Sequence, residues 1–363
     1  MKRLLKSEHP ILLLLIFVPM AVVLRYGVDG ADTWVFVTSA LAVIPLAALI
    51  GRATEYLAEH VGAGLGALLN ATFGNAAELI IAVIALGKGY HDLVKASITG
   101  SIIGNVLLVF GLSALLGGIR HQTQRFNRTA ASLGATMLLL AAIALVVPAI
   151  FHTIVGQGAA PSEHKLSLLI SFILIVTYLL SLLFSLRTHS HLYTGATSSG
   201  DTEPSEGSRW SRSRSVAVLL ASSGLVGLMS ELLVGSVEHA ADAMGMNEVF
   251  IGVILVALVG NAAEHSTAVM VALKNKMDLS INVAIGSSLQ VALFVAPVLV
   301  FLSYAIGRDP LDLLFTPMEV VAVGVSVGIM EALSQDGETH WMEGVQLLAV
   351  YAIVAVAFFF LPG

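Results

Sequence analysis

Long apolar runs separated by short polar stretches occupy most of this 363-residue chain. Runs of about 20 residues are long enough to cross a bilayer as helices. A transmembrane barrel would instead show alternating segments of about 10 residues. The pattern therefore predicts an all-α polytopic membrane protein with about eleven transmembrane helices. The predicted spans are 11–26, 33–59, 67–86, 93–117, 130–151, 166–186, 215–244, 250–273, 279–305, 311–333 and 344–361.

Two segments interrupt this apolar pattern. The basic segment Met1 to Lys6 precedes the first apolar run, which fits either a signal peptide or a first transmembrane helix. No small-residue cleavage site stands out after the run, and this favours a retained helix. Residues 187–214 lose the apolar period and are rich in Ser, Gly and charged residues, which is typical of a solvated linker.

A five-residue motif recurs inside two of the apolar runs. Gly74 to Glu78 reads Gly-Asn-Ala-Ala-Glu and returns unchanged at Gly260 to Glu264, an offset of 260 − 74 = 186 residues. The offset holds without a gap over 66–109 against 252–295, with 17 identities in 44 positions. The chain therefore contains an internal duplication.

The duplication defines the expected domains. These are an N-terminal segment with a leading transmembrane helix (1–32), a first five-helix repeat (33–186), a cytoplasmic linker (187–214) and a second five-helix repeat (215–363). Because five is an odd number of helices, the second repeat must enter the membrane upside down relative to the first. Two inverted repeats are a recurrent design of transporters, with the binding site where the repeats meet.

Composition narrows the function classes. Hydrophobic residues make up 57% of the chain and charged residues 12%, and the mean hydropathy is +0.90. The net charge is −6 without a basic block, so a nucleic-acid partner is not expected, and the absence of Cys excludes thiolate chemistry and disulfides. With the N-terminus in the cytoplasm, 13 of the 18 Lys and Arg residues fall in inside segments, as the positive-inside rule requires.

Glu78 and Glu264 lie in the middle of predicted spans, where an unpaired charge costs at least about 3 kcal/mol. The pseudo-twofold symmetry of inverted repeats is expected to bring the two carboxylates together. Such a pair resists joint ionisation and retains protons, whereas a divalent cation favours both ionised carboxylates and expels the protons. This competition predicts antiport by alternating access. The alternative is that the two Glu residues only hold helices together.

Further oxygen donors flank both Glu residues. Asn75 and Asn261 lie three positions before them, a Gly precedes each Asn, and Ser101 and Ser287 each follow a Gly. The predicted metal ligands are Glu78, Glu264, Asn75, Asn261, Ser101, Ser287, Gly74 and Gly260, and Glu78 and Glu264 also carry the coupled protons. An all-oxygen set suits Ca²⁺ better than Mg²⁺ because Ca²⁺ accepts more ligands in looser geometry. Mn²⁺ is also compatible.

A second set of acidic residues follows helical spacing. Glu55 and Glu59 are four positions apart, and Glu231, Glu238 and Asp242 fall on one stripe of a single predicted helix. We interpret the stripes as walls of cation access paths; the alternative is that they face bulk water at helix ends. His265 is a candidate for moving protons beside Glu264, with a packing role as the alternative. The predicted cation pathway comprises Glu55, Glu59, Glu231, Glu238, Asp242 and His265.

Several stretches together resemble one known family. Gly74 to Glu78, Gly260 to His265, Lys274 to Leu279 and Ala284 to Val291 are similar to motifs of the calcium/proton exchangers of the CAX family, within the cation/calcium exchanger superfamily. The segment from Asp336 to Gly344 resembles the start of that family's last helix. The resemblance runs from Thr33 to the C-terminus and implies eleven helices in a leading helix plus two inverted repeats. It also implies Ca²⁺/H⁺ exchange at Glu78 and Glu264. The regulatory acidic helix of the eukaryotic linkers has only a short counterpart here, at 201–206.

Other functions remain open from the sequence. A Na⁺-driven or K⁺-dependent calcium exchanger would typically carry a Ser/Thr-Pro-Glu type motif, and a passive divalent-cation channel usually gains symmetry from identical subunits. No nucleophile arrangement, phosphate loop or cofactor motif supports an enzyme. We expect no cofactor, with the lipid bilayer, Ca²⁺ and H⁺ as partners, in the plasma (inner) membrane of a prokaryote. The sequence leaves open whether the chain forms a homo-oligomer.

Overall fold

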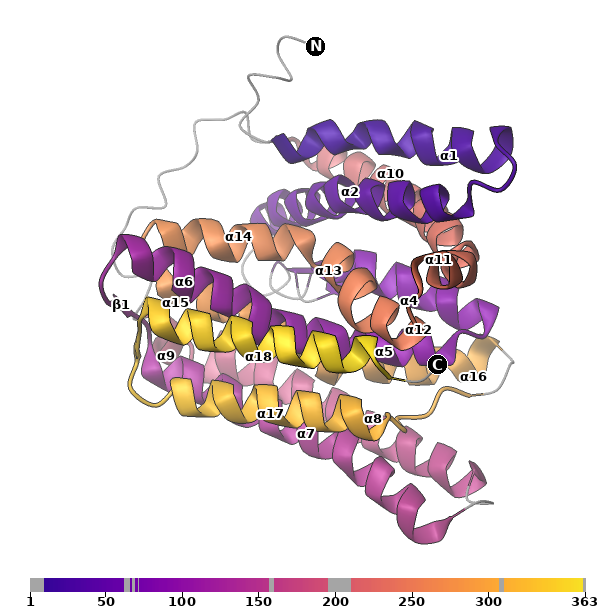
Figure 1. Ribbon diagram of the computed structural model, residues 1–363. Helices are drawn as coiled ribbons and strands as arrows, with labels where there is room; N and C mark the ends of the chain where they lie inside the picture. The colour runs from indigo at the N-terminus through magenta and orange to yellow at the C-terminus, as the bar shows by residue number, and fades with distance from the viewer. Residues whose placement is uncertain are drawn as a thin grey trace. The chain divides into compact units, whose positions relative to one another are not determined.

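The structure, a computed structural model, describes residues 10–61, 66, 69–70, 72–156, 160–194, 210–306 and 310–361. It divides into two compact units. The first contains Met1–Val94, Ser208–Ala263 and Leu361–Gly363, and the second contains Lys95–Gly207 and Glu264–Phe360. Figure 1 shows that both units are built almost entirely from helices.

The first unit packs its helices around α2. Its elements are η1 (Pro10–Ile16), α1 (Phe17–Gly27), α2 (Asp32–Val61), α4 (Ala76–Lys88), the first turn of α5 (His91–Ile103), α10 (Arg212–Gly235), α11 (Val237–Met244), α12 (Glu248–Phe250), η4 (Ile251–Val256) and α13 (Ala257–Gly260). Helix α2 lies against both α1 and α10, and α10 also packs against α4 (Figure 1). The buried side chains of α2 are mostly small or apolar, including Ala42, Leu46 and Ile50, which permits close packing.

The second unit has a longer list of elements. It contains the remainder of α5, η2 (Gly104–Val109), α6 (Phe110–Arg120), β1 (Gln124–Arg125), α7 (Arg128–Val155), α8 (Ala160–Leu183), η3 (Phe184–Thr188), α9 (His191–Thr194), α14 (Ala262–Leu273), which begins at the end of the first unit, α15 (Met277–Gln290), η5 (Val291–Val295), α16 (Ala296–Ile306), α17 (Pro317–Leu333), β2 (Glu338–Thr339) and α18 (Trp341–Phe359). Strands β1 and β2 pair antiparallel, with Gln124 opposite Thr339. Helix α7 packs against α15 and α17, and α18 packs against α6 (Figure 1).

The compact units cut across the two repeats expected from the sequence. Each unit takes segments from both, because helices at nearly equivalent positions pack together: α2 with α10 in the first unit, and α7 with α17 in the second. The repeats are therefore a property of the sequence order, and their inverted arrangement stays a prediction. The central part of the predicted linker, 195–209, lies outside the described residues.

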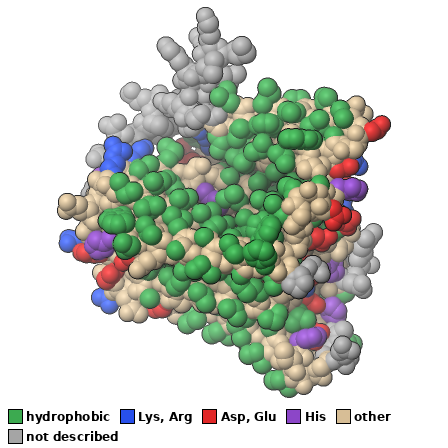
Figure 2. All heavy atoms as spheres, viewed as in Figure 1, with side chains coloured by type: hydrophobic (Ala, Val, Ile, Leu, Met, Phe, Trp, Pro, Cys, Tyr) green, Lys and Arg blue, Asp and Glu red, His purple; other side chains and the backbone are tan. Residues whose placement is uncertain are grey.

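The membrane-spanning helices agree with the prediction in kind. Within the part of the chain that is described, seven helices are long and apolar enough to cross a membrane, and an eighth is added if α11 to α13 form one bent span. Within the described residues each predicted span overlaps a helix or an interrupted helix, but α4 and α17 are short, with 13 and 17 residues, and α17 begins only at Pro317 of the span 311–333. The exact count of eleven stays a prediction. Hydrophobic side chains cover most of the face seen in Figure 2.

Two predicted spans are wrong as single helices. The span 215–244 ends at Gly235, and α11 begins after Ser236, whose backbone (φ −115°, ψ 6°) leaves the helical region. Helices α11 and α12–α13 then meet at a bend of 110°. The span 250–273 is interrupted at Asn261, between α13 and α14. In both cases apolar residues lie on each side of the interruption, so a hydropathy average over a whole span does not locate it.

Irregular backbone recurs at matching positions of the duplication. A turn at Gly74 and Asn75 precedes α4, and Asn261 interrupts the helix before α14. The π-helical segment η2, shifted by 186 residues, overlaps the π-helical segment η5. π-Helical turns are rare and occur frequently at functional sites. Each copy of the duplicated motif therefore contains a break in the helix and is followed by a π-helical segment.

Candidate functional site

Glu78 of the first motif contacts the second motif inside the first unit. It lies in the first turn of α4, and its side chain is buried. Asn261 Nδ2 donates a hydrogen bond to Glu78 Oε1 and a second one to the carbonyl of Ala257 at 2.9 Å. Asn261 is itself buried. Two segments 183 residues apart in sequence are thus brought together through their motif residues.

The Gly that begins the second motif makes this contact sterically feasible. A Cβ atom added at Gly260 would lie 2.9 Å from Glu78 Cγ. Carbon atoms in favourable contact are about 3.5–4.0 Å apart, so any larger residue at this position would displace Glu78. Gly260 therefore serves close approach of the two motifs; backbone carbonyl ligation by Gly74 or Gly260 stays a prediction.

Asn75 is a buried amide that makes no side-chain hydrogen bond to any described residue. It is the N-cap residue of α4, yet its side chain makes no capping bond, and neither Oδ1 nor Nδ2 has a partner among the residues described. Leaving a buried polar group unsatisfied costs about 1–3 kcal/mol. An amide oxygen held in this way beside a buried carboxylate suits a polar or cationic substrate, and it fits the predicted oxygen-donor set.

Both motif carboxylates occupy the first turn of a helix. Glu78 is in the first turn of α4 and Glu264 in the first turn of α14. The positive end of the helix dipole favours the ionised carboxylate by about 0.3–1 kcal/mol at such positions. The helix dipole therefore lowers the cost of a negative charge at each motif when the proton leaves. Next to Glu264, the Nε2 atom of His265 is buried and has no hydrogen-bond partner in the described part of the chain.

Asn105 contacts a predicted ligand residue, and the sequence reasoning missed it. In the second unit Ser101 of α5 and Ser287 of α15 are both buried, and Asn105 Nδ2 donates to Ser287 Oγ at 3.0 Å. Asn105 lies in the π-helical segment η2 and is also buried. The equivalent position in the second repeat is occupied by Val291, so a search for repeated polar residues does not find Asn105. The sequence signal that could have identified Asn105 is an amide side chain inside an otherwise apolar run.

The predicted acidic stripes have different surroundings. Glu55 and Glu59 are exposed on α2. The break at Ser236 places Glu231 on α10 and Glu238 and Asp242 on α11, so the single stripe predicted for these three is wrong. A role of these carboxylates in cation access stays a prediction.

Basic and phenolic groups hold two of these carboxylates in the first unit. Lys88 Nζ lies 2.8 Å from Glu231 Oε1, and the Tyr90 hydroxyl donates to Glu238 at 3.0 Å. Burial, reinforced by Glu238, raises the pKa of Tyr90, so Tyr90 stays a hydrogen-bond donor at neutral pH. Glu248, which lies within electrostatic reach of Glu238, Asp242 and Asp92, was not predicted.

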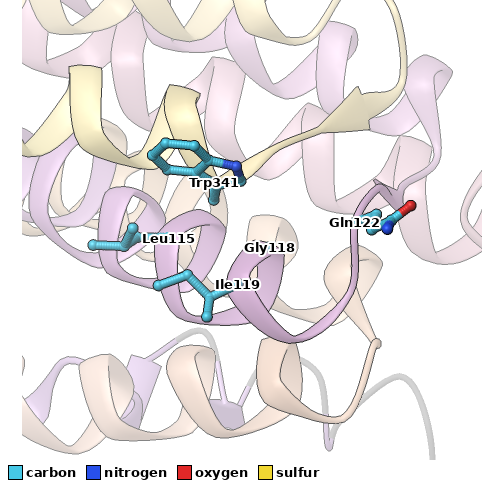
Figure 3. A pocket seen from close by; sticks show the side chains of 5 residues that line it. All are labelled: Leu115, Gly118, Ile119, Gln122 and Trp341. Carbon is cyan, nitrogen blue, oxygen red and sulfur yellow. The ribbon is translucent and has the colours of Figure 1, made fainter.

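The side chains that usually hold a resident metal ion are His, Asp and Glu, since the chain has no Cys. Within the described ranges, no group of three or more His, Asp or Glu side chains is placed to hold a metal ion. The amide and hydroxyl oxygens of Asn75, Asn261, Ser101 and Ser287 are the additional donors of the predicted set. A surface depression of about 540 Å³ is lined by Leu115, Gly118, Ile119, Gln122 and Trp341. Figure 3 shows Leu115 and Ile119 of α6 near the Trp341 ring of α18; none of the five is a predicted site residue.

Comparison with known proteins decides the family. The pattern that defines the family described as "Sodium/calcium exchanger protein" matches residues 31–187 and 214–360. The chain belongs to this family. Its resemblance to the cation/calcium exchangers, inferred from the duplicated motifs, is confirmed. The match also places the chain in a family of transporters rather than of enzymes.

Relatives of this family member align over nearly its whole length. A "Ca(2+)/H(+) antiporter" of Aphanothece halophytica is 47% identical over 96% of this chain and 96% of its own length. The "Ca(2+)/H(+) antiporter ChaA" of Bacillus subtilis is 45% identical over 90% of this chain and 92% of its own. The solved structure of native YfkE has 40% identity, a TM-score of 0.83 and coverage of 97% and 100%. A crystal structure of the H⁺/Ca²⁺ exchanger CAX, at 15% identity and TM-score 0.68, covers 96% and 91% and supports the fold alone.

Proposed function

We propose that the protein is a secondary active antiporter that exchanges Ca²⁺ for protons across a membrane. Two relatives of 47% and 45% identity carry the name Ca²⁺/H⁺ antiporter and align with nearly all of this chain. The observation in the structure that carries the proposal is the buried contact between Glu78 of one motif and Asn261 of the other. It joins the duplicated motifs at an ionisable group, as an ion-binding centre formed by two repeats requires.

In this proposal Glu78 and Glu264 bind Ca²⁺ and protons in turn. Ca²⁺ binds both carboxylates in their ionised form, which the helix N-termini favour, and protons neutralise the same oxygens when Ca²⁺ leaves. Asn75, Asn261, Ser101 and Ser287 supply neutral oxygens, which suit the high coordination number of Ca²⁺. Mn²⁺ is a further substrate to test. Access changes sides only in the occupied or the protonated state, which couples the two fluxes.

The finer architecture is part of the same proposal. The two halves of the chain form inverted five-helix repeats after a leading helix, with eleven spans and a cytoplasmic N-terminus in a prokaryotic plasma membrane. Glu55 and Glu59 line one access path, and Glu231, Glu238 and Asp242 another. Among the described residues, only Glu231 of these five carboxylates forms an ion pair, with Lys88. His265 relays protons next to Glu264.

Everted membrane vesicles with an imposed pH gradient test the function. The wild-type protein is expected to accumulate Ca²⁺ against its gradient, and Glu78→Gln or Glu264→Gln is expected to abolish accumulation at normal abundance in the membrane. Glu338→Gln is the matched control, because Glu338 pairs with Arg125 near the surface. Transport at the wild-type rate by both motif variants would refute the site assignment.

The same vesicles separate the other functions. Accumulation that stops when Na⁺ is replaced by choline would identify a Na⁺-driven exchanger. Ca²⁺ movement that only follows its own gradient, together with single-channel currents in a planar bilayer, would identify a channel. Our proposal predicts accumulation that continues in choline and collapses when the pH gradient is dissipated.

A further inference from the structure

A network of buried polar side chains in the second unit anchors α5 on the side away from Ser101. Glu319, in the first turn of α17, is only 2% exposed. Thr99 Oγ1 donates to Glu319 Oε1 at 2.9 Å. The backbone N–H and the hydroxyl of Thr316 donate to Glu319 Oε2 at 2.9 and 2.8 Å. Both carboxylate oxygens are therefore used, one for the N-terminus of α17 and one for α5.

A second tie lies one helical turn earlier on the same face of α5. Lys95 Nζ is 3.3 Å from Asp312 Oδ1 and donates to the carbonyl of Leu314 at 3.0 Å. Lys95 and Thr99 are four residues apart, so they lie on one helix face. Lys95 joins α5 to the segment that leads into α17, and Thr99 joins α5 to the first turn of α17 itself. Two ties one turn apart restrict both rotation of α5 about its axis and sliding along it.

The segment that receives these ties is itself firmly held. Between Pro310 and Thr316 the chain is not helical, and Leu311, Leu313 and Phe315 are buried. The Leu311 N–H donates to Ser303 Oγ of α16 and the Leu313 N–H to Ser167 Oγ of α8, both at 2.9 Å. The segment therefore connects α5 to two further helices and serves as a fixed reference for its position.

The two sides of α5 have different tasks. Ser101 follows Thr99 by two residues, and at about 100° per residue two residues turn the side chain roughly to the opposite face of a helix. Asn105, four residues beyond Ser101, donates to Ser287. The proposed ligand face of α5 thus carries Ser101 and Asn105, and the anchored face carries Lys95 and Thr99. A rotation of α5 could therefore move Ser101 and Asn105 only if the contacts of Lys95 and Thr99 were broken.

We propose that Glu319 is a positioning residue for cation binding, acting through Thr99 to fix the rotational register of α5 and so the place of Ser101. The proposal rests on the proposed function, because it assumes that Ser101 lies in the cation site. Glu319 has no acidic counterpart in the first repeat, where position 133 is Leu. The anchor therefore makes the two halves of the transporter unequal.

The test removes the hydroxyl of Thr99 while conserving its shape. Thr99→Val is expected to raise the apparent KM for Ca²⁺ about tenfold with little change in maximal rate, since small displacements of a binding group cost one to two orders of magnitude. Thr99→Ser keeps the hydroxyl and is expected to restore the wild-type KM. Thr136→Val is the matched control, because the exposed Thr136 donates to the carbonyl of Ser132 in its own helix and to no other group among the described residues.

A double-mutant cycle with Ser101→Ala distinguishes positioning from general stability. If Thr99 acts through Ser101, Thr99→Val adds little to the KM of Ser101→Ala, whereas independent effects would multiply. Multiplying effects, or a Thr99→Val protein with unchanged KM and only a lower melting temperature, would overturn the proposal. Glu319→Gln, which keeps one acceptor oxygen, is expected to give a smaller rise in KM than Thr99→Val. Absence of Ca²⁺ transport in the wild-type protein would refute the proposed function instead.

Discussion

A single methyl group at Gly260 offers a sensitive probe of the contact between the two motifs. Gly260→Ala would place Cβ 2.9 Å from Glu78 Cγ. Because the preferred carbon–carbon separation is about 3.5–4.0 Å, Glu78 must retreat by about 0.6–1.1 Å. The side chain is buried, so this movement also disturbs the hydrogen bond from Asn261.

The expected cost falls mainly on transport. A displacement of about 1 Å of a functional group can reduce activity about 10²-fold, so we expect Vmax/KM for Ca²⁺ to fall by about 10- to 100-fold. The effect on stability is smaller. Overpacking costs about 1–3 kcal/mol, and Ala in place of Gly recovers about 0.5–1 kcal/mol within a helix.

The assay compares Gly260→Ala with Gly51→Ala in the same vesicle preparation. Gly51 lies within α2, and a Cβ there would meet no atom within 4 Å, so this variant should transport like the wild type. Ca²⁺ uptake is normalised to the amount of transporter, and thermal stability is measured in detergent. A Gly260→Ala protein with wild-type Vmax/KM would show that the position of Glu78 does not limit transport.

Two further predictions concern packing and surface charge. Gly344→Ala would place Cβ 2.6 Å from the carbonyl oxygen of Gly111 and against the backbone nitrogen of Leu115, and these backbone atoms cannot move aside. We therefore expect α18 to separate from α6 and much of the folded protein to be lost, as measured by size-exclusion chromatography of the detergent-extracted membrane fraction. A normally folded variant would contradict the packing. Lys88→Met breaks the partly exposed ion pair with Glu231. Because exposed ion pairs contribute about 0–1 kcal/mol to stability, we expect the melting temperature to shift by no more than a few degrees. A drop of tens of degrees would contradict this.

Helical spans were predictable because a run of about 20 apolar residues has few other uses in a protein. Their interruptions were not. The residues around Ser236 keep a spacing that a single helix would also satisfy, yet the helix ends at Gly235, beside the Lys88 ammonium. Lys88 comes from a segment 147 residues away (235 − 88), so the local sequence does not predict this contact.

The residues that contact Glu78 were predictable because the duplication repeats them. Gly260 and Asn261 were singled out as copies of Gly74 and Asn75, and the structure brings this second copy against Glu78. Asn105 and Glu319 were missed because their counterparts in the other repeat are apolar. A carboxylate within a predicted span is already a functional signal, and that rule, applied without the repeat, would have found Glu319.

The most direct test of the central claim measures both ions at once on the purified protein in liposomes. With a pH-sensitive dye inside and Ca²⁺ added outside, the account predicts Ca²⁺ uptake accompanied by proton release, both lost in Glu78→Gln and in Glu264→Gln. Ca²⁺ uptake without any movement of protons, or coupled fluxes that persist in both variants, would contradict it.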